Sequence, residues 1–438
     1  MTADSSGNIL MRFAPMIYGP TILFTLGEGA VIPLFPVIAA RLGADLATAA
    51  VVAAALVVGQ LFGNVPAGWA VSRIGERLTM TFAGLAAILG VAAMVFSASV
   101  GMLMASVLII GFCASAFGLA RHSFMTTRVP LPFRARALAL LGGSWRLGMF
   151  IGPFAAAAIL LVTRDEHLVM WFFAVCLLAC VLLVFFGPDP EEQLQAEASA
   201  ARQAMDATDP PEFELEAEDL ILEDTDQVGT GSIPTLERKG VMATIWANRR
   251  VLSRVGVAAA TLSSVRAART AMLPLWGLAI GLDAENIALI VGISGAIDFA
   301  LFYASGQIMD RFGRIWAVLP SMIAMGLGFG VLAFTLEFGN AEIWFIGLSM
   351  FLALGNGLSS GILLTLGADL APQENPAPFL GAWRTLTDAG GAITPLAVAG
   401  IIAAASIAWA SGAVAVLGLI GAGMFARWLP RYVPHKKR

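Results

Sequence analysis

Long apolar runs, separated by short polar or charged stretches, dominate the pattern along the chain. Twelve such runs each extend over about 20–29 residues, and a helix of that length crosses a hydrocarbon core of ~30 Å. We expect membrane-spanning helices at residues 15–40, 47–71, 78–98, 101–126, 136–162 and 168–187, and again at 252–280, 286–309, 316–336, 341–366, 378–404 and 407–429. The pattern therefore predicts an all-α polytopic membrane protein with twelve transmembrane helices.

The composition supports this prediction and excludes several classes of protein. The chain of 438 residues is 58% hydrophobic and 13% charged, whereas soluble domains carry roughly 25% charged residues. No glycine-rich lysine loop for nucleotide phosphates and no nucleophile elbow occurs. The chain has only 3 histidines, too few for a zinc cluster. We therefore predict no enzyme, no ATP-driven pump, no metal and no cofactor. The scattered basic residues predict no nucleic-acid partner.

The basic residues of the short loops predict the orientation in the membrane. One side holds only Arg41 and Arg164, and the other holds Arg12, Arg73, Arg77, Arg128, Arg134, Arg136, Arg311, Arg314, Arg427, Arg431, Lys436, Lys437 and Arg438. Loops rich in Lys and Arg stay on the cytoplasmic side. We therefore expect an inner-membrane protein with both termini and the long central loop in the cytoplasm.

A direct repeat at an offset of 238 residues relates the two halves of the chain. Pro36 corresponds to Pro274 and Gly43 to Gly281, and the same register relates Asp45 to Asp283, Trp145 to Trp383 and Arg146 to Arg384. The repeat predicts two six-helix bundles, at 1–187 and 251–438, related by a pseudo-twofold axis along the membrane normal. Between them lies an acidic segment, 188–250, which holds about half of the 30 acidic residues and is predicted to be a solvated linker.

Two loops carry a motif of glycines, an acid and basic residues. The copy after the second helix contains Gly68, Ser72, Arg73 and Gly75, with Ser72 in place of the acid. The copy after the eighth helix is complete, with Gly306, Asp310, Arg311, Gly313 and Arg314. The fifth helix contains Gly148, Gly152 and Pro153. These motifs resemble those of the major facilitator superfamily, and the last resembles the core of its antiporter motif. The resemblance implies a secondary transporter of the twelve-helix drug and metabolite efflux branch.

An ionisable side chain in mid-membrane is costly unless it is paired or hydrated, so each one is a candidate functional residue. In the first helix, Glu28 continues a polar stripe formed by Tyr18, Thr21 and Thr25. The repeat places Glu28 at the depth of Arg266 in the seventh helix, where Arg269 and Thr270 follow. We expect these side chains to line the substrate cavity, with Glu28 exchanging protons and Arg266 or Arg269 tuning Glu28 or holding an anion. The alternative is an ion pair that only joins helices.

The remaining intramembrane polar residues predict further contacts. We expect Asp298 to approach Arg146 across the two halves, or to pair with Arg266 or Arg269. Arg384 and Asp388 are four residues apart on one helix and can pair with each other. Asp298 and Asp388 are further proton-coupling candidates. Asn356, Ser359 and Ser360 share one face of the tenth helix and are candidates for substrate contacts or for helix packing. We interpret Arg121 and His122 as the solvated cytoplasmic end of the fourth helix.

These predictions favour proton-coupled efflux, by antiport, of small amphipathic compounds through alternating access. The alternative is a proton symporter that imports an organic anion or another metabolite, and a remote alternative is a membrane sensor or scaffold that transports nothing. The proton gradient is the expected driving force. The expected partners are the lipid bilayer and a small-molecule substrate, and the expected state is a monomer. The sequence leaves the identity of the substrate open.

Overall fold

The computed structural model describes residues 17–128, 131–187, 245–372 and 376–433. Within these ranges the chain forms helices and turns without any strand. Ten helical segments in the described part are long and apolar enough to cross a membrane. One of the ten, Leu46–Val95, is long enough to cross twice. The helix Val257–Ala279 is not among the ten, because Arg266 and Arg269 lower its hydropathy, but its 23 residues have spanning length. The described part of the chain therefore has twelve membrane-spanning segments, as the sequence predicts.

The first six spans are formed by seven helical elements. In chain order they are α2 (Gly19–Val31) with η2 (Ile32–Leu34) and α3 (Phe35–Arg41), then α4 (Leu46–Val95), α5 (Val100–Arg128), α6 (Leu131–Thr163) and α7 (Glu166–Phe186). Helix α4 contains both the second and the third expected spans. Gly75 separates them with φ 80° and ψ 171°, a conformation that glycine adopts without the strain of a side chain. The loop glycine of the first motif is therefore the turn between two spans.

The other six spans repeat this order with one difference. They are α10 (Arg249–Val251), η3 (Leu252–Gly256) and α11 (Val257–Ala279), followed by α12 (Ala284–Arg311), α13 (Arg314–Leu332) with η4 (Thr335–Glu337), α14 (Ala341–Leu358) and α15 (Ile362–Leu370), α16 (Pro376–Ala404), and α17 (Ile407–Tyr432). The span expected at 341–366 is present as Ala341–Leu370, but it contains a break that the apolar pattern does not predict. The tenth span breaks between α14 and α15 at Gly361, which has φ +81°, a value that a right-handed helix does not allow.

The loops between the first two spans of each half also follow the repeat. Gly43 and Gly281 both have positive φ, +87° and +79°, and each is followed by an aspartate that begins the next helix. Asp45 Oδ1 accepts a hydrogen bond from the Thr48 amide at 2.8 Å, which caps α4 and holds the pKa of Asp45 below its usual value. Asp283 occupies the same place before α12 but makes no side-chain cap bond.

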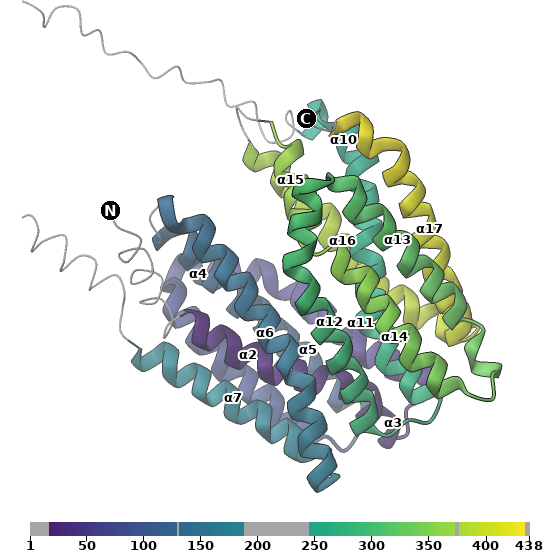
Figure 1. Cartoon of the computed structure of the whole chain (residues 1–438). Helices are drawn as coiled ribbons and strands as arrows, with labels where there is room; N and C mark the ends of the chain where they lie inside the picture. The colour runs from purple at the N-terminus through teal and green to yellow at the C-terminus, as the bar shows by residue number, and fades with distance from the viewer. Residues whose placement is uncertain (1–16, 129–130, 188–244, 373–375, 434–438) are drawn as a thin grey trace, which may run out of the picture.

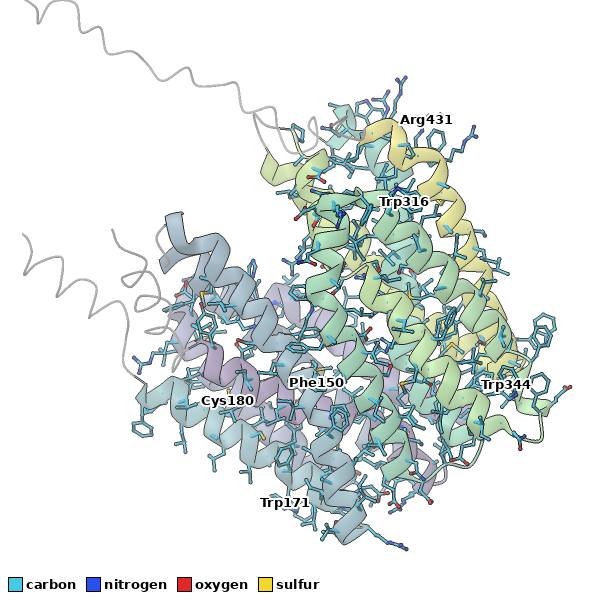
Figure 2. All side chains as sticks on the ribbon, viewed as in Figure 1. Phe150, Trp171, Cys180, Trp316, Trp344 and Arg431 are labelled. Carbon is cyan, nitrogen blue, oxygen red and sulfur yellow. The ribbon has the colours of Figure 1, made fainter. Side chains whose placement is uncertain are left out.

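The two bundles touch mainly where α6 packs along α12 and α16 packs along α4. Figure 1 shows them diverging toward the end where α10 and α15 lie. Along α6 and α12, the rings of Phe150 and Phe299 stack at 5.5 Å between centroids. A side chain at Gly292 would touch Phe154, and one at Gly295 would touch Phe150. We call this α6–α12 contact the seam; Phe150 marks it in Figure 2.

The two ends of the molecule differ in charge. The end at which α10 and α15 lie, called the basic end here, carries Arg73, Arg77, Arg311, Arg314, Arg427 and Arg431. At the opposite end the halves meet around a cavity of about 170 Å³. Its lining includes Arg41 and Glu166, which form an ion pair within the first half, and Asp283 and Glu285 from the second half. The two halves are thus closed together at the opposite end and apart at the basic end.

Candidate functional site

The predicted polar stripe of α2 is buried inside the first bundle. Glu28 is 6% exposed, and Thr21 and Thr25 are almost fully buried. The two threonine hydroxyls donate to carbonyls of their own helix, at 2.6 Å to Ile17 and 2.8 Å to the carbonyl of Thr21. The Tyr18 hydroxyl donates to the Ala137 carbonyl at 3.4 Å. Glu28 is therefore the ionisable member of this stripe, and its side chain, unlike those of Tyr18, Thr21 and Thr25, does not hydrogen-bond a backbone carbonyl.

The charge that faces Glu28 comes from α5. Arg121 and Glu28 attract each other electrostatically, without a direct ion pair among the described residues. The interpretation of Arg121 as a solvated helix end is wrong: α5 continues to Arg128, which places Arg121 about two turns inside the helix, and its side chain is half-buried. We expected Arg266 or Arg269 of the second half to act on Glu28. In the structure the arginine whose charge acts on Glu28 is Arg121, from the same half.

In the second half, Arg269 and Asp298 form a direct ion pair. Arg269 Nη1 lies 2.6 Å from Asp298 Oδ2, and its Nη2 donates to the Ser294 hydroxyl. This confirms one of the pairings predicted for Asp298. Arg146 comes from α6 of the other half, where its guanidinium lies 3.9 Å from the centre of the Phe302 ring. The charge of Arg146 also interacts with that of Asp298, as the alternative prediction expects.

Arg266 binds the break in the tenth span instead of a carboxylate. Its Nη2 donates to the Ser359 carbonyl oxygen at 2.6 Å and to the Ser359 hydroxyl at 2.7 Å. Ser321 of α13 contacts the same hydroxyl at 2.7 Å. A helix break inside a membrane leaves backbone groups without helical partners, and these must be satisfied by neighbouring side chains. The Ser359 carbonyl also accepts from the Ile362 amide at 3.1 Å, so Arg266 adds a second bond at the end of α14.

Two more helices stabilise the same break. Ser305 of α12 donates to the Ser360 carbonyl oxygen at 2.8 Å, and Trp383 Nε1 of α16 donates to the Leu363 carbonyl oxygen at 2.9 Å. Side chains from α11, α12, α13 and α16 thus converge on the junction between α14 and α15. The side chains of Ser321, Ser305 and Trp383 were not predicted as contacts of this site.

Four buried atoms of the second-half polar side chains already described or predicted have no hydrogen-bond partner within the described residues. They are Arg266 Nε, Arg269 Nε, Asp298 Oδ1 and Asn356 Oδ1. Buried polar atoms are satisfied in most folded proteins, so atoms of this kind mark a place where a ligand can bind. The set offers two cationic donors and two acceptors, which suits a ligand with an anionic group and a hydrogen-bond donor. Thr270 is exposed beside it and bonds the Arg266 carbonyl at 3.2 Å.

A second charged pair lies on α16. Arg384 Nε is 3.4 Å from Asp388 Oδ2, and the two side chains are 71% and 67% exposed. The predicted pairing of these residues along one helix is confirmed. Arg384 also interacts electrostatically with His122 on α5, so this pair faces the other half of the molecule. Charges this exposed on a helix that packs against α4 are consistent with an opening toward the basic end.

The loop and helix motifs have clear structural roles. Gly313 has φ +96° and turns the chain between α12 and α13. Arg314 then bonds Asp310 at 3.2 Å and Asp369 of α15 at 2.9 Å, which ties the complete motif to the broken tenth span. In the first copy, the Ser72 hydroxyl donates to the Trp69 carbonyl of its own helix at 2.8 Å. It therefore does not take the place of the missing acid.

The glycines of the fifth span bring two helices together. A Cβ at Gly148 would overlap the Thr25 hydroxyl and the Ile22 carbonyl, and one at Gly152 would overlap the backbone of α2 between Leu26 and Ala30. Gly29 of α2 in turn lies against Met149. Pro153 lies within α6, which continues through it. These residues fix the distance between the helix that carries Glu28 and the helix that forms the seam.

Comparisons with known proteins agree with this architecture. The family model described as Major Facilitator Superfamily matches residues 20–395. A curated relative named probable metabolite transport protein CsbC, from Bacillus subtilis (strain 168), is 23% identical over 376 residues, covering 83% of this chain and 78% of that protein. The crystal structure of a POT family transporter in complex with a thioalcohol-conjugated peptide superimposes with a TM-score of 0.72 at 12% identity, over 97% of this chain and 96% of the other.

A further solved structure has the same fold. The crystal structure of a D-xylose–proton symporter gives a TM-score of 0.67 at 14% identity, with 97% of this chain and 98% of the other covered. At such identities the likeness concerns the fold. In the described part of this chain no group of three or more His, Cys, Asp or Glu side chains could hold a metal ion.

Proposed function

Because the chain belongs to the major facilitator superfamily, we propose that it transports a small organic anion or zwitterion together with protons. It is a multi-pass membrane transporter and not an enzyme, and transport by this family needs no cofactor. The substrate class, the coupling to protons and the direction are the proposal. The observation that carries it is the mid-membrane guanidinium of Arg266, which hydrogen-bonds a neutral carbonyl and a hydroxyl.

The charge balance of the site supports an anionic substrate group. Arg146, Arg266 and Arg269 face one another electrostatically around a single carboxylate, Asp298. Arg269 already holds Asp298 at 2.6 Å, so the positive charge of Arg266 is not balanced by a direct ion pair within the described residues. An excess charge at this depth is costly. A carboxylate or phosphate from the substrate would balance it, and the planar fork of a guanidinium suits either group.

Binding of an anion would change the bonds at the helix break. In this structure the Nη2 of Arg266 is engaged by Ser359, whereas its buried Nε has no partner among the described residues. An anion that takes both donors forms stronger, charge-assisted hydrogen bonds and releases the Ser359 carbonyl. The junction between α14 and α15 then loses one of its bonds. For a zwitterion, Asp298 Oδ1 and Asn356 Oδ1 are oxygen acceptors that could bind its ammonium group.

Glu28 is the proposed proton site. Its carboxylate is 6% exposed and makes no hydrogen bond within the described part of the chain. Asp298 is held by Arg269, and Asp388 pairs with Arg384 in an exposed position. Protonation of Glu28 would remove the charge that attracts Arg121 of α5 and would loosen α2 from α5. Proton and substrate would then act on the same equilibrium between two facings of the transporter, which is what coupling requires.

The remaining assignments follow from the charge of the loops. We place the basic end in the cytoplasm, since Lys and Arg accumulate there. Both termini and the acidic segment would then be cytoplasmic, as the sequence predicts. The described structure would be the inward-facing state, since its halves are apart at the basic end and closed at the opposite end. The transporter would work as a monomer.

Proton movement in liposomes tests the proposal. The purified full-length chain is reconstituted with a trapped pH dye, and anions, zwitterions and lipophilic cations are added outside in turn. We expect anions or zwitterions to carry protons inward with them. Arg266→Gln should remove the response, and Glu28→Gln should leave substrate exchange intact without proton movement. If neither anions nor zwitterions move protons in the parent protein, the proposal is wrong.

Efflux of amphipathic compounds by proton antiport is the second candidate. The close approach of Gly148 and Gly152 to α2 favours it, because these glycines form the motif that resembles that of the antiporter branch. The same assay separates the two candidates. Lipophilic cations that drive protons in the direction opposite to their own movement would support antiport, and Arg266→Gln would then have little effect.

A further inference from the structure

A cluster of arginines and aromatic rings lies at the basic end, away from the transport site. Arg254 of η3, Arg427 and Arg431 of α17 all surround one indole ring, that of Trp428. Their guanidinium carbons lie 4.2, 5.2 and 5.0 Å from the ring centre. Figure 2 shows Arg431 at the end of α17, beside α10. Three positive charges therefore converge on one ring from two different parts of the chain.

No carboxylate of the described residues balances the charges of this cluster. None of the three arginines forms an ion pair with a carboxylate in the part of the chain that the structure describes. Arg254 donates to the Tyr432 hydroxyl at 2.9 Å, which is a neutral partner. Cation–π contacts contribute about 0.5–1 kcal/mol each at exposed sites, but they do not remove the mutual repulsion of three neighbouring cations. An anion with several oxygens would.

The position of the cluster indicates which anion would bind to it. η3 leads into α11, and α17 ends at Tyr432, so the cluster lies where two membrane spans leave the bilayer. Nearby, Trp246 is 70% exposed, and Arg249 lies 4.8 Å from its ring centre. Exposed tryptophans beside arginines are typical of the headgroup region of a membrane. Basic pockets at this depth between spans are suited to acidic headgroups.

We propose that Arg254, Arg427, Arg431 and the rings of Trp428 and Tyr432 bind the phosphate of an anionic phospholipid. The guanidiniums would hydrogen-bond the phosphate oxygens, and the Trp428 ring would keep the arginines in place through cation–π contacts. The bound lipid would join the start of α11, which carries Arg266, to the end of α17. This site is separate from the transport site and does not depend on the substrate proposed above.

The acidic segment 189–226 is the competing occupant, since it is rich in carboxylates and precedes α10 in the chain. We favour the lipid because the cluster lies at the ends of two membrane spans, where phosphates are always present. A carboxylate-rich segment would have to be drawn to the membrane surface against the repulsion of the acidic headgroups there. The experiment therefore includes a variant of this segment.

Lipid binding by the purified full-length chain tests the proposal. The protein in a neutral detergent is titrated with phosphatidylglycerol, with phosphatidylcholine of the same acyl chains and with inorganic phosphate. Bound lipids are counted by native mass spectrometry, and the midpoint of thermal unfolding is recorded. The test variant is Arg254→Gln/Arg427→Gln/Arg431→Gln. The control, Lys436→Gln/Lys437→Gln/Arg438→Gln, removes the same number of charges from the neighbouring end of the chain.

We expect phosphatidylglycerol to bind the parent protein and the control, and to bind the test variant at least about tenfold more weakly, which equals about 1.4 kcal/mol. Phosphatidylcholine should bind none of them. Equal losses in the test variant and the control would show an unspecific basic surface and overturn the proposal. So would inorganic phosphate that competes as well as the lipid. Lipid binding that appears only after the acids of 189–226 are replaced by Asn and Gln would assign the cluster to that segment.

Discussion

Two pairs of residues at equivalent places in the two halves have opposite chemistry. The repeat relates Glu28 of α2 to Arg266 of α11, and Arg121 of α5 to Ser359 at the end of α14. In the first half a buried carboxylate is attracted by an arginine. In the second half the arginine is on the other helix of the pair and bonds a backbone carbonyl at 2.6 Å. Equivalent helices meet in both halves, α2 with α5 and α11 with α14. The arginine lies on α5 in the first half and on α11 in the second.

The difference extends to the backbone. α5 runs without a break from Val100 to Arg128, whereas its counterpart is divided into α14 and α15 at Gly361. At this break the Ser359 carbonyl accepts two hydrogen bonds, one from the Ile362 amide at 3.1 Å and one from Arg266 at 2.6 Å. With the roles proposed above, one symmetric frame would hold a proton site in one half and an anion site in the other. The predictions below test this division, starting with the largest expected effect.

Replacing Arg266 should have the largest effect on transport. In Arg266→Gln we expect kcat/KM for an anionic substrate to fall by about 10–100-fold, since hydrogen bonds to charged groups contribute about 1.5–3 kcal/mol. Arg266→Lys should retain part of the activity. The mirrored variant Arg121→Gln should leave substrate affinity unchanged and alter proton coupling. Flux in liposomes measures all three, and an equal loss of affinity in both glutamine variants would contradict the division between halves.

Breaking the Arg269–Asp298 pair should have the largest effect on stability. Removal of one partner from a fully buried pair costs about 3–5 kcal/mol, and we expect Arg269→Met to cost less, about 2–3 kcal/mol, because the Asp298 side chain is 24% exposed. The double variant Arg269→Met/Asp298→Leu should recover most of the loss. Thermal unfolding in detergent measures both. A double variant as unstable as the single one would show that packing, and not the unpaired charge, is responsible.

Gly361 should be needed for the break in the tenth span. Its φ of +81° would cost another residue about 1–2 kcal/mol, although a Cβ there meets only Phe302, at 4.0 Å. Gly361→Ala should therefore lower stability through the backbone alone. Gly347 of α14 is a matched control, because a Cβ there meets nothing within 4 Å and its φ lies outside the positive range. Gly347→Ala should be neutral or slightly stabilising in the same unfolding measurement.

The exposed pair on α16 should have the smallest effect. Exposed ion pairs contribute about 0.2–1 kcal/mol, and Arg384→Gln, Asp388→Asn and the double variant should stay within about 0.5 kcal/mol of the parent. A double-mutant cycle on the unfolding midpoint measures the coupling of the pair. A coupling above about 2 kcal/mol, well beyond the range of exposed pairs, would place the pair in a buried position in another facing of the transporter.

Much of the architecture could be predicted from the sequence because lipid imposes a simple rule. Apolar length alone located the spans, and the repeat located equivalent loops such as those at Gly43 and Gly281. The intramembrane charges were also evident, since each one is an exception to that rule. The pairing along α16 followed from the spacing of Arg384 and Asp388, and the pairing of Asp298 with Arg269 was one of three alternatives.

The partners of Glu28 and Arg266 could not be predicted in the same way. Arg121 lies near the end of an apolar run, so its pattern is that of a solvated helix end, and only the packing of α5 shows that it faces α2. The break at Gly361 was missed because an apolar run has the same hydropathy whether or not its helix is interrupted. The repeat contained one unused signal: since it relates Glu28 to Arg266 and Arg121 to Ser359, a contact in one half implies a contact in the other.

The seam between α6 and α12 has a mechanical consequence. It joins the halves by the stacked rings of Phe150 and Phe299, by phenylalanines against Gly292 and Gly295, and by the Arg146 guanidinium over the Phe302 ring. No hydrogen bond or direct ion pair links the described residues of these two helices. Dispersion contacts, unlike hydrogen bonds, do not depend on a fixed donor–acceptor direction, so we expect that one helix can roll over the other. We therefore expect the seam to act as a pivot. It would keep the two halves in contact during rotation and would stabilise neither the inward-facing nor the outward-facing state over the other.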